Sequence, residues 1–389
     1  MAFAILKFLI PFLLHLTTPS PLLTIPSSPL PSYDVLIIGG GPAGLSAASA
    51  LGRVQRSALL IDSGVYRNAQ TQHVHDVITR DGTVPSIFRA LAREEIARYG
   101  TVRMMNGTVT SIASEGNGSY FTTSTAAGMQ YLSKKVILAT GVRDLIPDTP
   151  GLATAWGRGV YWCQWCDGYE HISRPVANLG PFSPSLIQGA IADTTLSPQQ
   201  LLLTNGTYNN TTVAATAAIL PNWAEQIKAY GIGIENRVIE RIGRVKGDES
   251  DWEDDLEVVF VEGGSVVRNA IHARFGAEVA SGELLRGVGV GMVRDEAGVE
   301  YVGVDEHMEA SVPGVFVVGD ANSLELGYVA DLDGKGLLAK EYTNATLGIP
   351  HSKRDVFVDD NFEDAKRRLQ RPMVEHNSAE DLFKYLKDW

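Results

Sequence analysis

Residues 33–54 read YDVLIIGGGPAGLSAASALGRV, and they set the architecture of the chain. The first part is an apolar strand pattern and the second part is an alanine-rich helix pattern. The turn between them carries Gly39, Gly41 and Gly44 in the spacing GxGxxG. Glycines at this spacing allow a tight turn, the close approach of a pyrophosphate and close helix–strand packing. The stretch therefore predicts a Rossmann-type dinucleotide site, with phosphates at the amino end of the helix.

Further apolar strands follow this motif. SALLIDSG (57–64) predicts the second strand, and its Asp62 can accept hydrogen bonds from the ribose hydroxyls of a dinucleotide. KKVILATG (134–141) and PGVFVVGD (313–320) predict strands that end in glycine. Between them, RPVANLG, QQLLLTNG and DDLEVVFVEGG predict strands of a middle region. The fold class is therefore α/β, with two Rossmann-like dinucleotide-binding-type domains, the second inserted in the first.

The expected domain division follows from these strands and from composition. It consists of a signal-like segment and Pro/Ser linker (1–32), a discontinuous dinucleotide-binding domain (33–149 and 287–347), an inserted domain (150–286) and a charged tail (348–389). The net charge of −12 over 389 residues argues against a nucleic-acid partner or an anionic membrane surface.

The start of the chain favours the secretory pathway. MAFAILKFLIPFLLHL is apolar but too short to cross ~30 Å of hydrocarbon, so no stable transmembrane span is expected. It resembles the core of a secretory signal, and an unstructured extension is the alternative. Six of the 14 asparagines lie in glycosylation sequons, where chance predicts about two. These are Asn106, Asn117, Asn205, Asn209, Asn210 and Asn344.

The only two cysteines, Cys163 and Cys166, lie in WCQWCDGY (162–169). A CxxC pair can close a small disulfide and exchange two electrons with a flavin. Asp167 is the candidate general acid/base beside this pair. The alternatives are a structural disulfide, which stabilises little because its loop is short, and a capping role for Asp167. The two cysteines would need further ligands to hold zinc, and His171 alone is insufficient, so no metal site is predicted.

A family resemblance rests on GGGPAGLSAA, DSGVYRNAQTQHVHDV, ATGVRDLIPDTPG, CQWCDGYE and GDANS. These runs resemble the thioredoxin-reductase-like FAD flavoproteins and, more narrowly, the gliotoxin-type dithiol oxidases of fungal secondary metabolism. The resemblance implies a homodimer, FAD as cofactor, Cys166 as the flavin-proximal thiol and Cys163 as the interchange thiol. The FAD contacts expected from the motifs and the resemblance are Gly39, Gly41, Pro42, Ala43, Gly44, Asp62, Arg67, Asn68, His75, Ala139, Gly319 and Asp320.

One departure concerns the residues that flank the CxxC pair. The fungal oxidases usually have histidine there, whereas this chain has Trp162 and Asp167. Proton transfer is therefore assigned to Asp167. His171 could substitute, with a solvated surface role as the alternative. Trp162 and Trp165 could line a flat apolar substrate site, or they could pack in the core.

The middle region lacks the features of a second nucleotide site. Gly180 is followed by Pro181, which has no N–H to donate, and by the bulky Phe182. No Lys or Arg occurs between Arg174 and Lys228, where a 2′-phosphate would need cations. The sequence therefore predicts an FAD-dependent enzyme that oxidises a small-molecule dithiol to a disulfide with O₂ as electron acceptor. The alternatives are an NADPH-dependent disulfide reductase and a non-catalytic flavoprotein of a biosynthetic assembly.

Overall fold

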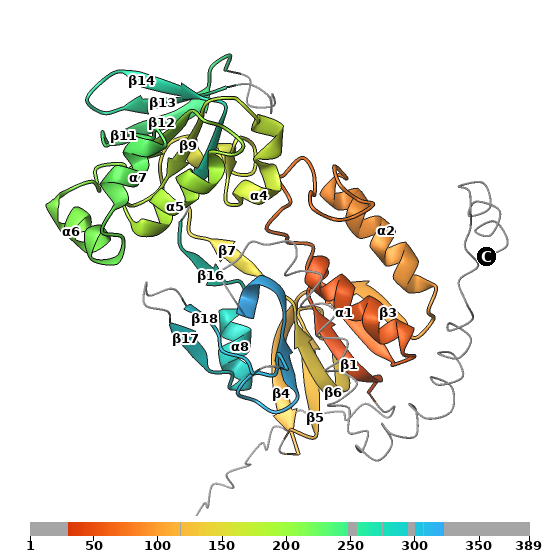
Figure 1. Ribbon diagram of the computed structural model, residues 1–389. Helices are drawn as coiled ribbons and strands as arrows, with labels where there is room; N and C mark the ends of the chain where they lie inside the picture. Colours follow the sequence, from red (N-terminus) through yellow and green to blue (C-terminus); the bar gives the residue numbers. More distant parts are fainter. Residues whose placement is uncertain are drawn as a thin grey trace, which may run out of the picture.

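The structure is a computed structural model that describes residues 30–322, except positions 117, 248–254, 274, 295–299 and 306. The described residues form two α/β units, which lie one above the other in Figure 1. The signal-like start, the charged tail and the sequons at Asn117 and Asn344 lie outside the described residues.

A seven-stranded sheet forms the first unit, in the order β3-β2-β1-β6-β5-β4, with β19 beside β6. The strands are β1 (Ser32–Ile38), β2 (Ala58–Asp62), β3 (Val102–Asn106), β4 (Val109–Glu115), β5 (Tyr120–Thr125), β6 (Gln130–Leu138) and β19 (Val315–Val317). Strands β3, β2, β1, β6 and β19 are parallel to their neighbours in this group. Their carboxyl ends therefore meet at one edge, where Gly39, Asp62, Ala139 and Gly319 lie.

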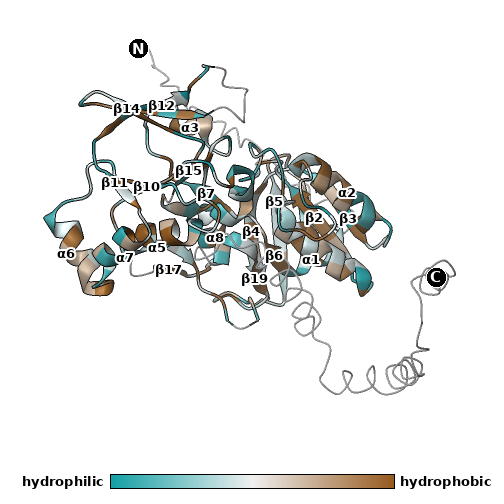
Figure 2. Ribbon diagram, turned by 45° about the horizontal axis from the view of Figure 1, so that its top comes forward, coloured by the Kyte–Doolittle hydropathy of each residue, from teal (hydrophilic) through white to brown (hydrophobic). Residues whose placement is uncertain are grey.

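Both faces of this sheet are covered, which explains why its strands read as unbroken apolar runs. Leu36 and Ile38 face one core, and Val35 and Ile37 face the other. Figure 2 shows hydrophobic colour along strands of this sheet such as β6. Helices α1 (Pro42–Arg53) and α2 (Pro85–Ala97) cover the second of these faces. No helix among the described residues has the length and apolar character needed to cross a bilayer.

The second unit contains a five-stranded parallel sheet in the order β11-β10-β9-β15-β8 and a three-stranded antiparallel sheet. The parallel strands are β8 (Val160–Tyr161), β9 (Val176–Leu179), β10 (Gln200–Leu203), β11 (Gly233–Glu235) and β15 (Ala270–Ala273). The antiparallel strands are β12 (Ile239–Arg244), β13 (Leu256–Phe260) and β14 (Ser265–Arg268). The helices are α3 (Leu152–Ala155), α4 (Gln164–Asp167), α5 (Pro184–Asp193), α6 (Asn210–Ile219), α7 (Trp223–Ala229) and the 3₁₀ turn η1 (Tyr169–His171).

Two short strands join the units. Strand β7 (Val142–Asp144) leaves the first unit, β16 (Ala277–Val279) returns to it, and the two pair antiparallel. Helix α8 (Gly282–Val288) then packs its Leu285 and Val288 into the core of the first unit. The remaining elements of that unit are β17 (Met292–Arg294), β18 (Glu300–Val302) and the 3₁₀ turn η2 (Gly319–Asn322).

The predicted architecture of two Rossmann-like units, the second inserted in the first, is confirmed. The return to the first unit comes earlier than the boundary expected after residue 286. Strand β16 already pairs with β7 at Ala277, and the apolar face of α8 is buried against the first sheet. Apolar spacing alone does not show against which of two sheets a short helix packs.

Candidate active site

The glycine motif lies at the carboxyl edge of the first sheet. Gly39 has φ +110°, and a Cβ there would collide with the carbonyl oxygen of Ala139. A Cβ on Gly44 would collide with the carbonyl oxygen of Gly39, and one on Gly319 would lie 2.8 Å from the Cβ of Ala43. The glycines therefore let the ends of β1, β6, β19 and α1 approach one another closely.

Gly41 differs from the other motif glycines because a Cβ there would meet no atom within 4 Å. It is the N-cap residue of α1, and Pro42 occupies the first turn. The first amides of a helix have no intrahelical partner and carry the positive end of the helix dipole. This open, amide-lined position, next to the closely packed Gly39 and Gly44, fits the pyrophosphate of a dinucleotide such as FAD.

Asp62 lies at the end of β2, as predicted, and is almost completely buried. Its carboxylate accepts hydrogen bonds from Tyr66 Oη (2.5 Å) and from the amide of Gly64 (3.0 Å), and it pairs with Arg93. Burial opposes ionisation, but these hydrogen bonds and the charge of Arg93 together lower the pKa of Asp62. The carboxylate is therefore a charged acceptor at the edge where a ribose would bind.

Arg67 connects three parts of the molecule. Its Nη2 and Nε donate to the two carboxylate oxygens of Asp144, at 2.6 and 3.0 Å, and its Nη1 lies 3.1 Å from Asp320 Oδ2. Its guanidinium carbon also lies 5.1 Å from the ring centre of Trp162. Burial by itself would lower the pKa of Arg67, but the two carboxylates raise it, so the guanidinium stays protonated.

Two more of the expected FAD contacts lie in the segment that follows β2. The side-chain oxygen of Asn68 lies 3.4 Å from Arg89 Nη1. His75 lies between Asp81 and Glu170, with each nitrogen 3.4 Å from a carboxylate oxygen. His75 thus contacts the second unit through Glu170, and its contact with FAD stays a prediction.

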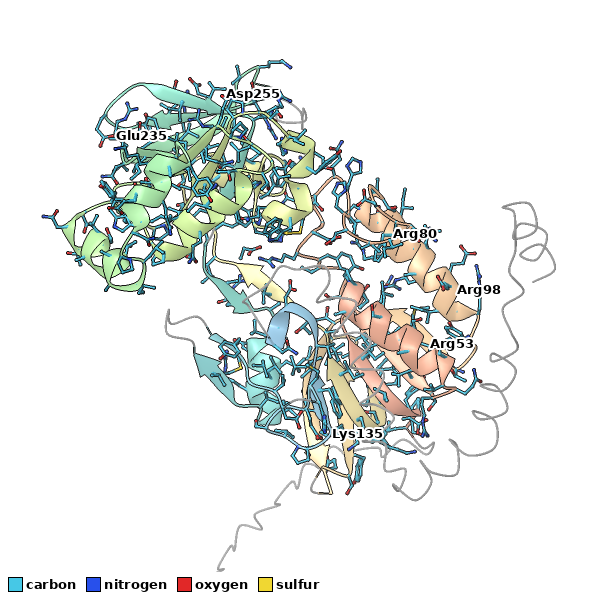
Figure 3. All side chains as sticks on the ribbon, in the orientation of Figure 1. Arg53, Arg80, Arg98, Lys135, Glu235 and Asp255 are labelled. Atoms are coloured by element: carbon cyan, nitrogen blue, oxygen red, sulfur yellow. A yellow bond between two sulfur atoms is a disulfide. The ribbon has the colours of Figure 1, made fainter. Side chains whose placement is uncertain are left out.

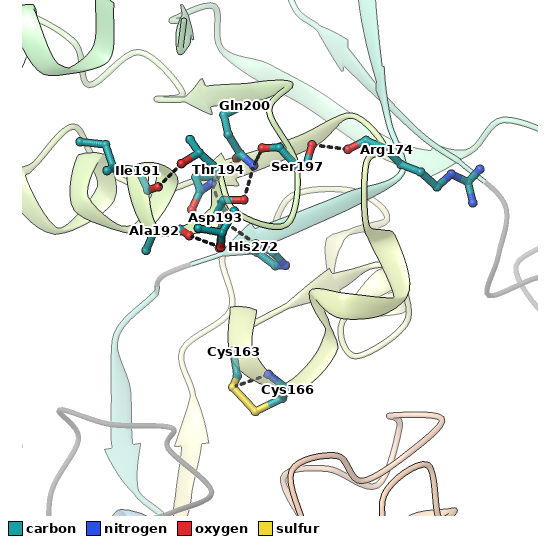
Figure 4. Close-up of polar contacts among 12 residues, drawn as sticks. Cys163, Cys166, Arg174, Ile191, Ala192, Asp193, Thr194, Ser197, Gln200 and His272 are labelled. Atoms are coloured by element: carbon teal, nitrogen blue, oxygen red, sulfur yellow. Dashed lines mark hydrogen bonds and ion pairs between the residues drawn. A yellow bond between two sulfur atoms is a disulfide. The ribbon is translucent and has the colours of Figure 1, made fainter. Parts of the chain in front are cut away.

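The two cysteines form a disulfide at the carboxyl end of β8. Cys163 is the N-cap of the four-residue helix α4, and its sulfur accepts the amide hydrogen of Cys166 at 3.1 Å. Figure 4 shows the bond on the side of the second unit that faces the first, and Figure 3 shows the same region within the whole molecule. Cys163 is only 5% exposed, whereas Cys166 is half-buried.

The assignment of Cys163 as the interchange thiol therefore stays a prediction. The exposed fractions of the two cysteines do not favour it, because Cys163 is the more buried of the two. In this arrangement of the two units, Cys166 offers more surface to a small molecule than Cys163 does.

Asp167 has an environment suited to proton transfer. Burial, followed by the negative charge of Glu170, raises the pKa of Asp167 to about 7. A carboxyl group with such a pKa exists in both protonation states near neutral pH, which is what a general acid/base requires. Asp167 directly follows Cys166 in helix α4.

The surface role considered for His171 is wrong. The residue is 6% exposed, and its Nδ1 lies 2.6 Å from Asn269 Oδ1 in a buried contact. Burial also lowers the pKa of His171, so the imidazole is neutral at neutral pH.

The two tryptophans beside the cysteines lie in different environments. Trp162 stacks on Trp156 with ring centres 5.8 Å apart, whereas Trp165 is exposed.

The β9–α5 loop of the second unit is filled by aromatic side chains. Phe182 is 3% exposed, and its ring centre lies 4.8 Å from that of Tyr208 and 5.1 Å from that of Trp223. The amide of Phe182 donates to Thr207 Oγ1 at 2.9 Å. Ser183 caps α5 by accepting the amide hydrogen of Leu186 at 3.3 Å. The amides of Phe182 and Leu186 are thus already bonded within the protein and are not free for a phosphate.

Sequence reasoning missed several contributors to these sites. Arg93 lies on α2 and reaches Asp62, and Asp144 lies on the connecting strand and holds Arg67. Thr207 and Tyr208 close the β9–α5 loop from the end of the neighbouring strand. For Thr207 the sequence did contain a signal, because it follows the strand β10. Adjacent parallel strands end at the same edge of a sheet, so Thr207 could be expected near the loop that follows β9.

Comparisons with known proteins agree with this geometry. The family model described as pyridine nucleotide-disulphide oxidoreductase matches residues 33–189. An alignment with the probable thioredoxin reductase of Arthroderma benhamiae is 39% identical over 311 residues and covers 77% of this chain and 76% of that protein. The chain belongs to the thioredoxin-reductase-like family of disulfide oxidoreductases.

Other members of this family extend the likeness. The thioredoxin reductase TcpT of Claviceps purpurea is 35% identical over 300 residues, covering 75% of this chain and 87% of that protein. The crystal structure of an oxidoreductase from Agrobacterium tumefaciens has a TM-score of 0.71 at 26% identity, covering 82% of this chain and all of that one. Like its relatives, the chain is an oxidoreductase, as the resemblance implied.

Proposed function

We propose that this chain is an FAD-dependent oxidase that converts a dithiol in a small secondary metabolite into a disulfide, with O₂ as the electron acceptor. The observation that supports this proposal most strongly is the aromatic filling of the β9–α5 loop. Phe182, Tyr208 and Trp223 pack together at the loop that would carry the phosphates in a Rossmann-type nucleotide site, which supports entry of electrons through the cysteines.

The first unit supplies the residues that would hold FAD. Gly41 and the amino end of α1 suit the pyrophosphate, Asp62 suits the adenosine ribose, and Asp320 lies at the edge expected for the ribityl chain. When bound, FAD supplies an acceptor for two electrons, which O₂ takes up with two protons as hydrogen peroxide.

The cysteine pair performs the sulfur chemistry by thiol–disulfide exchange. One substrate thiolate attacks one sulfur of the Cys163–Cys166 bond, forms a mixed disulfide and releases the other cysteine as a thiolate. The second substrate thiolate then attacks the substrate sulfur of the mixed disulfide and releases the second cysteine. The substrate loses two electrons and two protons, and the cysteine pair becomes reduced.

Asp167 would accept one of the two protons that these steps release, and the other would go to solvent. Its raised pKa, about 7, lets it take a proton from a substrate thiol near neutral pH. It directly follows Cys166 in the sequence and lies in the same short helix α4.

The relatives favour a second candidate, an NADPH-dependent disulfide reductase, because several carry the name thioredoxin reductase. A reductase needs a second nucleotide site with free amides and cationic side chains. In the described part of the second unit the amide of Phe182 is bonded to Thr207. The absence of Lys and Arg between residues 174 and 228 also argues against a 2′-phosphate site.

Anaerobic titration of the FAD-loaded protein decides between these functions. We expect dithiothreitol to bleach the flavin absorbance and NADPH to leave it unchanged. In air, dithiothreitol alone should drive oxygen consumption and hydrogen peroxide formation. Bleaching by NADPH would favour the reductase, and no bleaching by either reagent would favour a non-catalytic flavoprotein.

The cellular setting in this proposal is the secretory pathway, where an oxidising environment suits disulfide formation. Four sequon asparagines among the described residues are exposed, namely Asn106, Asn205, Asn209 and Asn210. A homodimer is part of the same proposal and rests on the family resemblance.

A further inference from the structure

A column of stacked side chains crosses the joint between the two units. The guanidinium of Arg67, in the first unit, lies over the ring of Trp162 at 5.1 Å. The ring of Trp162 stacks on Trp156 at 5.8 Å with an interplanar angle of 26°. Trp156 in turn stacks on Phe275 at 5.7 Å and 28°. Four flat groups, from three separate stretches of the sequence, are therefore linked by successive face contacts.

The arginine end of this column is anchored by two carboxylates. Asp144 binds the guanidinium through two hydrogen bonds, and Asp320 binds it through a third. The side chain of Asp144 is 8% exposed, so this pair is largely shielded from solvent. A planar guanidinium can make such a forked ion pair and still present its face to an aromatic ring.

Both connecting strands are attached to the column. Asp144 is the last residue of β7, and Phe275 precedes the return strand β16 by two positions. The contacts thus form a closed ring from β7 through Arg67, Trp162 and Trp156 to Phe275 and β16. Figure 1 shows β7 and β16 side by side between the units, as their pairing requires.

We propose that Arg67 is a positioning residue that sets the orientation of the Cys163–Cys166 pair against the flavin-binding unit. The inference rests on the proposed function. Trp162 immediately precedes Cys163, so the contacts that hold its indole also restrain the backbone that leads into the disulfide. Electron transfer from the cysteines depends on that placement, because small displacements of reacting groups lower rates strongly.

The test compares variants of the FAD-loaded full-length protein in anaerobic flavin reduction by dithiothreitol. Arg67→Met and Trp162→Leu should each slow reduction by about tenfold or more. Arg67 is also an expected FAD contact, so rates are compared at equal flavin occupancy. Trp162 is not an expected FAD contact. If the proposal holds, Trp162→Leu should therefore lower the rate of flavin reduction as much as Arg67→Met does. Trp162→Phe keeps a ring and should recover most of the rate.

A double variant and a matched control sharpen this test. If Arg67 and Trp162 act as one unit, the double variant should be no slower than the slower single variant. Arg143→Met removes an exposed ion pair to Glu278 on the same pair of strands and should change the rate less than twofold. Rates near wild type in both single variants, or losses that multiply in the double variant, would overturn the proposal.

Hydrogen–deuterium exchange separates this proposal from the proposed function. Amides of residues 142–146 and 275–279 should exchange faster in Arg67→Met than in the wild type and in Arg143→Met. That measurement needs no turnover. If dithiothreitol fails to reduce the wild-type flavin, the proposed function fails while exchange still tests the column. Unchanged exchange in Arg67→Met would refute the positioning role alone.

Discussion

At the scale of single residues, the site contains two carboxyl groups in different environments. Asp144 forms an ion pair with the guanidinium of Arg67. Asp167 is in the opposite situation. Burial and the negative charge of Glu170 both disfavour its ionised form and raise its pKa. The ion pair suits Asp144 to an anchoring role, and the raised pKa suits Asp167 to the proton transfer that we propose for it.

The pH dependence of dithiol oxidation tests Asp167. Because the base form is needed to accept a thiol proton, the rate of flavin reduction should rise with pH through about 7. Asp167→Asn should lower the rate and remove this inflection. Glu170→Gln removes a charge that raises the pKa, so it should move the inflection to lower pH. An unchanged profile in Asp167→Asn would contradict the role.

The same shift predicts an effect on stability. The folded-state pKa of about 7 lies above the ordinary value of 3.8, so ionisation of Asp167 is opposed in the native protein. The free energy of unfolding should therefore fall as pH rises from about 4 to about 7. Asp167→Asn should lack this contribution, which urea unfolding at several pH values can measure.

The two sulfur atoms differ in exposure, and this predicts their reactivity. Cys166→Ser should abolish dithiol-driven bleaching and leave the yellow colour of the bound flavin. In labelling with a small aromatic disulfide, Cys166 in the Cys163→Ser variant should react faster than Cys163 in Cys166→Ser, because Cys163 is more buried. The reverse order would support the roles implied by the family resemblance.

At the scale of elements, the β9–α5 loop is a Rossmann-type turn whose aromatic side chains are packed together. The strand, the turn and the helix keep the Rossmann arrangement. Phe182 replaces the small residue that a phosphate requires, and its ring makes edge-to-face contacts with Tyr208 and Trp223. The loop therefore contributes apolar packing where a binding site would leave free amides.

Truncation of Phe182 tests this interpretation. Phe182→Ala should lower the free energy of unfolding by about 3 kcal/mol, because it leaves a cavity among aromatic rings. Phe182→Leu, which fills part of the space, should cost less. Neither variant should acquire flavin reduction by NADPH, since the cationic side chains are still missing. Urea unfolding and anaerobic absorbance spectra measure both outcomes, and bleaching of Phe182→Ala by NADPH would show that a nucleotide site lies beneath the ring.

At the scale of the whole molecule, the two units meet through a joint that has one defined set of contacts. The strands β7 and β16 carry the chain across, and the column from Arg67 to Phe275 fixes the units beside them. An enzyme whose electrons enter only through its cysteines needs a single productive orientation. The arrangement of the joint is consistent with that requirement.

If the chain enters the secretory pathway, as we propose, its exposed sequons predict N-linked glycans. Asn209 caps α6 by accepting the amide hydrogens of Thr211 and Thr212, and its Nδ2 donates to Thr207. We therefore expect glycosylation at Asn210 rather than at Asn209. Asn210→Asp should remove this glycan, and Asn209→Asp should keep both the cap and the glycan.

Mass spectrometry before and after peptide N-glycosidase treatment measures this outcome. A chain without any glycan, isolated from a eukaryotic secretory host, would contradict the proposed localisation.

Local sequence patterns were sufficient to predict the first Rossmann-type unit and a CxxC pair able to close a disulfide. Gly39, Gly44 and the CxxC pair act through spacings of a few residues, which a single stretch of sequence displays. The three-dimensional fold was needed to pair Arg67 with Trp162, to bury His171 against Asn269 and to join α8 to the first unit. Those contacts link residues far apart along the chain, and short-range periodicity carries no information about them.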